Sequence, residues 1–157
     1  MIALFKRSAA ALPAVALVLS CAVAGAGELN PAAVTYKLPD QIQWSAPSPA
    51  GAQSALLAGD PTKEGLYVQL VKWPAGNHFS HPHFHPHDRF ITVIKGTWWV
   101  SLGSEADVYN PDKMTAVKQG SFIFEPAFGH HYDQARDEEV IVQIMGTGPG
   151  EVDPARE

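Results

Sequence analysis

All seven histidines of this 157-residue chain fall between His78 and His131, and five of them lie within ten residues. A stretch of seven residues inside that cluster has histidine at every second position. Side chains two residues apart in an extended strand point to the same face, so His83 and His85 can reach a single ion. Imidazole nitrogen is a common ligand of transition metals. The spacing therefore predicts a metal site to which the distant His131 supplies a third ligand.

The surroundings of these histidines distinguish them from a histidine-rich surface tract, which binds metal only loosely. Gly76 precedes the cluster, a Pro-His-Asp turn follows it, and Gly96 closes the next apolar run. Turn residues at both ends are typical of short strands in an all-β domain. We therefore predict an internal site. Further candidates for a ligand, or for a hydrogen-bond partner of one, are His81, His87 and Asp88, whereas the sequence assigns no role to His78.

With these glycines and histidines the chain resembles the cupin family of small β-barrels. The first cupin motif runs Gly, five residues, His-x-His, three or four residues, Glu, six residues, Gly. Here six residues separate Gly76 from the His-x-His at 83–85, one more than in the family, and Gly96 takes the closing position. Arg89 stands where the family has its glutamate.

The second cupin motif runs Gly, five residues, Pro-x-Gly, two residues, His, three residues, Asn. Gly120 and His131 keep these spacings, but Phe128 replaces the second glycine and Ala135 replaces the asparagine. The resemblance covers about Leu66 to Met145. It implies an all-β fold, a double-stranded β-helix (jelly-roll) cupin barrel.

Arg89 changes what the resemblance implies about the metal. The family's glutamate would supply a fourth ligand and a negative charge, whereas a guanidinium stays protonated and does not ligate metal. In this register the site consists of three neutral imidazoles. A second register stays open, in which His81 and His83 pair with Asp88 and restore a carboxylate, although two other spacings of the motif are then lost.

The preferred register predicts one divalent metal ion bound by His83, His85 and His131. Three protein ligands leave open coordination positions, as a catalytic metal requires. Imidazole suits Fe, Zn, Ni and Cu, and the family resemblance adds Mn. Similarity to three-histidine cupins implies a metal-dependent enzyme, dioxygenase-like or of another small-molecule chemistry, that acts on a small organic acid. The alternatives are a non-catalytic exported protein that binds metal or a small ligand, and a barrel that has lost its metal.

Arg89 is the candidate catalytic residue, because a guanidinium inside a barrel needs an anionic partner. One interpretation is a bidentate contact with a substrate carboxylate. The other is a structural salt bridge to Asp88, Glu125 or Asp133. Glu125 is also a candidate base near His131.

The N-terminus has the order of segments found in secretory signal peptides, with Lys6 and Arg7, an apolar stretch broken by Pro13, and then small residues. The apolar stretch is short for a membrane span. We assign residues 1–26 to a signal peptide and expect an exported protein, periplasmic or extracellular. The only cysteine, Cys21, lies in this segment, which leaves a lipid anchor at Cys21 as a less favoured alternative.

Charge and length exclude some functions for the remaining chain. Without Lys6 and Arg7 it has 9 basic and 16 acidic residues, a net charge of −7. Phosphate backbones bind basic surfaces, so we expect no nucleic-acid partner. About 130 residues are the usual size of one domain.

We divide that domain into an N-terminal arm with edge strands (27–50), a barrel (51–146) and a flexible tail (147–157). The apolar runs at 90–94 and 140–144 predict strands covered on both faces, which makes a homodimer a candidate assembly. Residues 104–118 are expected to form a long loop. The predicted strands are Leu66–Trp73, Phe79–His85, Phe90–Lys95, Thr97–Leu102, Ser121–Phe124, His130–Gln134 and Val140–Met145. The aromatic residues expected in the core are Trp98, Trp99, Phe122, Phe124 and Tyr132.

Overall fold

The computed structural model describes residues 32, 36–103, 106–150 and 153–154, and a compact unit begins at Lys37. The signal-peptide prediction for residues 1–26 lies outside the described residues. No helix in the described part of the chain is long and apolar enough to cross a membrane. The elements, in chain order, are η1 (Pro39–Gln41), β1 (Gln53–Ala58), β2 (Gly65–Trp73), β3 (His83–Phe84), β4 (Arg89–Lys95), β5 (Thr97–Leu102), η2 (Pro111–Lys113), β6 (Thr115–Lys118), β7 (Phe122–Glu125), β8 (His131–Gln134), β9 (Val140–Gly148) and β10 (Asp153–Pro154).

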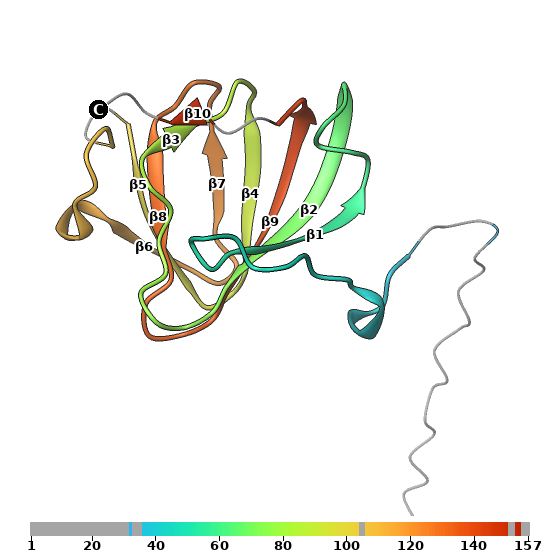
Figure 1. Ribbon diagram of the computed structural model, residues 1–157, viewed down its shortest axis with the longest axis horizontal. Coiled ribbons are helices and arrows are strands. Elements are labelled where there is room, and N and C mark those ends of the chain that lie inside the picture. Colours follow the sequence, from blue (N-terminus) through green and yellow to red (C-terminus); the bar gives the residue numbers. More distant parts are fainter. Residues whose placement is uncertain (1–31, 33–35, 104–105, 151–152, 155–157) are drawn as a thin grey trace, which may run out of the picture. The chain divides into compact units, whose positions relative to one another are not determined.

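Two antiparallel sheets of five strands each make up this unit (Figure 1). The first has the order β1-β2-β9-β4-β7 and the second the order β10-β3-β8-β5-β6. Strands distant in sequence become neighbours, since β2 and β4 both pair with β9, and β3 and β5 both pair with β8. From β2 onward the chain changes sheet at every connection except that between β5 and β6. This is the predicted jelly-roll barrel, and the all-β prediction is confirmed.

The two sheets share one apolar core. Alternate residues of β4 and β9 point inward, so that Ile91, Val142 and their neighbours are almost fully buried. Trp98 of the second sheet packs in the same cluster and is 1% exposed. Burial of each large apolar side chain contributes about 1.5–3 kcal/mol, so this cluster contributes much of the stability of the barrel.

The outer face of the first sheet differs from the expectation. The runs at 90–94 and 140–144 are covered on the barrel side, but Phe90 and Ile94 are 40% and 42% exposed. Phe122 and Phe124, expected in the core, are 62% and 48% exposed and pack beside Phe90, with ring centroids 6.4 and 5.5 Å away. An apolar run does not show which face of a strand is covered. Here the barrel interior covers the inner face, and the outer face lacks a covering layer in the described part of the chain.

The segment boundaries also differ in detail. In the described part of the arm the only regular element is the 3-10 turn η1, and the edge strand is β1, which begins at Gln53. The predicted loop at 104–118 contains η2 and β6. Strand β9 continues to Gly148, past the predicted end of the barrel, and β10 in the predicted flexible tail pairs with β3. The strand expected at 79–85 is reduced to β3 and a single bridge between Phe79 and Gln134.

Candidate metal centre

The three predicted histidine ligands come together at one end of the barrel. His83 in β3 lies directly opposite His131 in β8. His85 follows β3 by one residue, so it shares the inward face with His83 while Phe84 points away and stacks on His130 at 5.2 Å. Strand pairing therefore joins residues 46 or 48 positions apart in the sequence into a single cluster.

The imidazoles form a compact triangle. Ring centroids are 5.1 Å apart between His83 and His85, 4.1 Å between His83 and His131, and 5.4 Å between His85 and His131. One ring nitrogen from each residue lies within 4.8 Å of the nitrogens of the other two. Among the described residues these three are the group of metal-binding side chains that meets this condition.

Hydrogen bonds orient two of the rings. Nδ1 of His83 bonds to the carbonyl oxygen of His81 at 2.6 Å, and Nδ1 of His131 bonds to the carbonyl oxygen of Gly129 at 3.0 Å. Since a carbonyl only accepts, each Nδ1 carries the hydrogen and each Nε2 keeps its lone pair. Metal-bound histidines in proteins have this arrangement, in which the second nitrogen donates to a carbonyl or carboxylate.

The electrostatics of the cluster favour neutral imidazoles. Burial lowers the pKa of His83 to about 4, and electrostatic interactions with His131 and Arg89 act in the same direction. Burial likewise lowers the pKa of His85 to about 3, together with Arg89. Both rings are therefore neutral at pH 7, and no proton has to leave before they bind a metal ion.

Arg89 is paired with Glu125 inside the barrel. The two residues lie opposite each other in the β4–β7 ladder. Nε and Nη2 of the guanidinium both contact Oε2 of the carboxylate, and both residues are almost fully buried. The structural salt bridge predicted as one interpretation of Arg89 is thus present, with Glu125 as the partner. Asp88 has a different role, because its Oδ1 accepts a hydrogen bond from the backbone of Ala127.

The same ion pair reaches His131. Nη2 of Arg89 donates to Nε2 of His131 at 3.1 Å, and Oε1 of Glu125 lies 3.0 Å from Nδ1. Burial raises the pKa of Glu125, but the hydrogen bond from His131 and the charge of Arg89 outweigh it and hold the pKa at about 2. Glu125 is thus a carboxylate at neutral pH, and the negative charge that is missing from position 89 is supplied from the neighbouring strand.

The remaining candidates lie outside the triangle. His81 contributes its carbonyl, while its ring packs edge-on against Phe79 at 5.1 Å. His87 and Asp88 are exposed. The structure groups His83 with His85 and His131, and not with His81 and Asp88 as the alternative register required. His130 turns outward and forms an ion-pair contact with Asp107.

Phe128 shows how the chain tolerates its departure from the second motif. Its φ of 60° lies in the left-handed region that favours glycine, the residue that the motif places there. Its backbone N–H donates to the carbonyl oxygen of His85 at 2.8 Å. The turn that leads to His131 therefore also fixes the backbone of His85.

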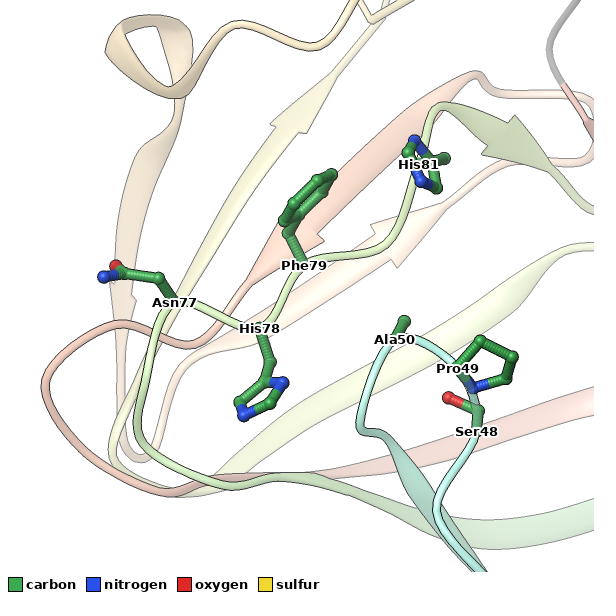
Figure 2. Close-up of a pocket in the computed structure, with 7 residues that line it drawn as sticks. All are labelled: Ser48, Pro49, Ala50, Asn77, His78, Phe79 and His81. Carbon is green, nitrogen blue, oxygen red and sulfur yellow. The ribbon is translucent and has the colours of Figure 1, made fainter.

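Two cavities adjoin this region of the chain. The larger, about 440 Å³, lies between Ser48–Ala50 and Asn77–His81 and contains none of the three clustered histidines (Figure 2). The smaller, about 200 Å³, lies between the two sheets, and His83, His85 and Arg89 are among the residues that line it. Chemistry at the histidines would take place in the smaller cavity. The lining also includes Tyr67, Gln69, Trp73, Ser80, Trp98 and Asp133.

Asp133 is the residue of this cavity whose position the sequence did not indicate. The sequence pattern indicated Asp133 only as a candidate salt-bridge partner of Arg89. In the structure it lies two residues beyond His131 on the inward face of β8 and is 4% exposed. Burial raises its pKa, and this effect outweighs the electrostatic interaction with His131 and a hydrogen bond from Ser80, which act in the opposite direction. The sequence signal that could have found Asp133 is its two-residue spacing from His131, because alternate residues of a strand point to the same face.

The lowered pKa values predict a pH-dependent stability for the metal-free protein. Below the ordinary histidine pKa of 6.5 the unfolded chain binds protons that folded His83 and His85 do not, so unfolding becomes easier as the pH falls toward 4 and 3. Each histidine contributes up to about 1.4 kcal/mol per pH unit in that window. Urea unfolding at pH 7.5 and 5.0 should show a loss of a few kcal/mol, which a His83→Phe variant should reduce. Equal stability at the two pH values would contradict this assignment.

The fold and the site define a small cupin barrel with a three-histidine cluster. The model of the ChrR cupin-like domain family matches residues 33–151, and the chain belongs to that family. Structures of similar fold include the polyketide cyclase RemF from Streptomyces resistomycificus, with 15% identity, 79% of this chain and 87% of that chain covered, and a TM-score of 0.65.

KdgF from Halomonas sp. has 19% identity, with 73% of this chain and 94% of that chain covered and a TM-score of 0.56. A cupin-2 domain from Rhodospirillum rubrum has 14% identity, with 79% and 81% covered and a TM-score of 0.60. At these identities the likeness shows the fold alone. No curated protein matches the chain.

Proposed function

We propose that this chain is an exported metal-dependent cupin enzyme in which His83, His85 and His131 hold one divalent metal ion. The observation that supports this most directly is the triangle of imidazoles, in which one nitrogen of each ring lies within 4.8 Å of the others. The carbonyl bonds of His83 and His131 orient the lone pairs of two of these rings. A bound divalent ion would act as a Lewis acid on an oxygen of the substrate.

The charges around the site favour an anionic substrate. The rings of His83 and His85 are neutral at pH 7, and the charge of Arg89 is balanced by Glu125. A divalent ion would therefore add a net charge of about +2 to a buried site, which needs a compensating anion. A small organic acid that places its carboxylate on the metal satisfies this need, and Arg89 lies close enough to the cluster to add a hydrogen bond.

Size limits the substrate further. The interior cavity of about 200 Å³ has the volume of roughly seven water molecules. It admits a molecule of three to five carbons, whereas polymers and nucleotides are too large. This agrees with the expectation of a small-molecule partner.

Metal loading followed by turnover tests the proposal. Chelator-treated protein is titrated with Zn²⁺, Co²⁺ and, without oxygen, Fe²⁺, and one equivalent is expected to bind. The loaded protein is then incubated with short organic acids, with and without O2, while oxygen uptake and products are measured. Turnover by the loaded but not the chelated protein is the expected result. Failure of every metal to bind stoichiometrically contradicts the proposal.

The alternative is a non-catalytic exported binding protein, and one observation favours it. Nη2 of Arg89 donates to Nε2 of His131, so this guanidinium lies close to where an ion bound to that nitrogen would be. Repulsion between the two positive charges would weaken metal binding and make it reversible. The same experiment separates the two functions, because the alternative expects one equivalent of metal without turnover.

A homodimer and export complete the proposal. The aromatic residues Phe90, Phe122 and Phe124 on the outer face of the first sheet support a second copy as the covering layer. Light scattering of the purified domain measures the assembly. Fractionation of expressing cells tests export, for which the segment at 1–26 is the support.

A further inference from the structure

Three buried polar atoms in residues that line the interior cavity have no hydrogen-bond partner among the described residues. They are the indole nitrogens of Trp73 and Trp98 and Oδ1 of Asp133. All three residues line the cavity that His83 and His85 also line, and they are 4%, 1% and 4% exposed. A buried polar atom without a hydrogen bond costs about 1–3 kcal/mol, so three beside one cavity indicate a site for a ligand's polar group.

Strand geometry places this polar group next to the metal centre. Asp133 follows His131 by two residues on β8, so both point inward with Cα atoms about 6.5 Å apart. Trp98 lies on the neighbouring strand β5, two residues from Val100, which pairs with Asp133. Trp73 approaches from β2 of the opposite sheet. Both sheets thus contribute residues to the wall of one cavity beside the imidazoles.

The chemistry of these atoms selects a particular group. An indole N–H only donates, and the Oδ1 of Asp133 needs a donor when its carboxyl is ionised. A carbonyl oxygen would satisfy the indoles but not Asp133, and an ammonium group would satisfy Asp133 but not the indoles. A hydroxyl group donates one hydrogen bond and accepts two, so it can satisfy all three.

We propose that the barrel binds a short-chain hydroxy acid, with its carboxylate toward the three histidines and its hydroxyl between Asp133, Trp73 and Trp98. The inference rests on the proposed function for the carboxylate end, and on the three buried atoms alone for the hydroxyl end. The cavity volume of about 200 Å³ restricts this acid to a short chain.

Paired ligands test the hydroxyl end. Calorimetry on the Zn²⁺-loaded protein compares 3-hydroxybutyrate with butyrate, and lactate with propionate. Because burial of the polar atoms without a partner disfavours the deoxy acid, at least one hydroxy acid is expected to bind at least about tenfold more tightly than its partner. Asp133→Ala should bring that ratio close to one without weakening the deoxy acid. Asp137→Ala, which removes an exposed acid three residues from the end of β8, is the matched control and should retain the ratio.

A second variant and a metal-free arm keep the outcomes distinct. Trp98→Phe retains most of the aromatic volume and removes one hydrogen-bond donor. It should lower the affinity ratio of hydroxy acid to deoxy acid by about fivefold. This variant tests the hydroxyl subsite if Asp133→Ala does not fold. In the chelated protein, 1-butanol should bind more tightly than 1-chlorobutane, which has the same chain but no hydroxyl, so the hydroxyl subsite is tested even if no metal binds. Equal affinity for the two ligands of every pair would mean that only ordered water occupies the subsite, and would overturn the inference. If the protein still binds one equivalent of metal in that case, the proposed function is unaffected.

Discussion

Replacement of His131 by alanine is expected to lower the affinity for a divalent metal ion by more than about 100-fold. Loss of an outer hydrogen-bond partner of a ligand already costs 10–100-fold, and His131 would be a ligand itself. It also holds the other two rings in register, since it pairs with His83 across β3 and β8. Competition titration of Zn²⁺ against a chelating dye measures the change.

The adjacent histidine supplies the matched control. His130 has the same side chain one position earlier, but it points to Asp107 and Phe84. His130→Ala should therefore leave the metal affinity within about twofold of the original protein. His83→Ala, at a less buried position, should reproduce the loss if His131→Ala proves too unstable to measure. Equal losses for His130 and His131 would mean that the histidine-rich segment scavenges metal loosely and that the triangle is not the site.

Replacement of Glu125 by glutamine is expected to destabilise the protein by about 3–5 kcal/mol. The substitution leaves the guanidinium of Arg89 buried beside three imidazoles with no carboxylate to balance it. Removing one partner of a buried ion pair has a cost of this size because the other charge stays out of water. Urea unfolding of the metal-free protein at pH 7.5 measures it.

Strand β4 offers a control for this prediction too. Lys95 at the other end of the strand pairs with Glu139 at 3.0 Å, but this pair is solvent-exposed. Glu139→Gln should cost less than about 1 kcal/mol, because water screens the remaining charge. The double variant Arg89→Met, Glu125→Leu should recover most of the stability lost in Glu125→Gln. A cost for Glu125→Gln no larger than for Glu139→Gln would show that the buried pair is solvated in solution.

The motifs predicted a large part of the fold. Glycine and proline punctuation separates short runs of β-forming residues, and most of the predicted strands overlap real ones within one to three residues. Strand β6 was missed because Thr115–Lys118 follows a loop sequence and pairs only at the edge of the second sheet. Strand β10 was missed because its pairing with β3 depends on the spatial position of a segment that reads as a polar tail.

What the sequence determined by itself is the set of histidines. Alternation in an extended chain is a local property, so His83 and His85 had to share a face, and the motif spacing singled out His131 over its neighbour His130. Only the tertiary structure decided the partner of Arg89. A pairing register between β4 and β7 places Glu125 opposite the arginine, and no local pattern specifies which strands become neighbours.

The interior cavity was likewise decided by tertiary structure. Trp73, Trp98 and Asp133 come from three strands on two sheets, and each taken alone in the sequence is an ordinary β residue or an acid beside a histidine. Their unpaired polar atoms acquire meaning only when the sheets close and exclude water, because hydrogen bonds to solvent would otherwise satisfy them. The histidines of the metal centre could thus be found from the sequence. The ion pair that balances the charge of Arg89, and the unpaired polar atoms in the cavity wall, depend on long-range packing.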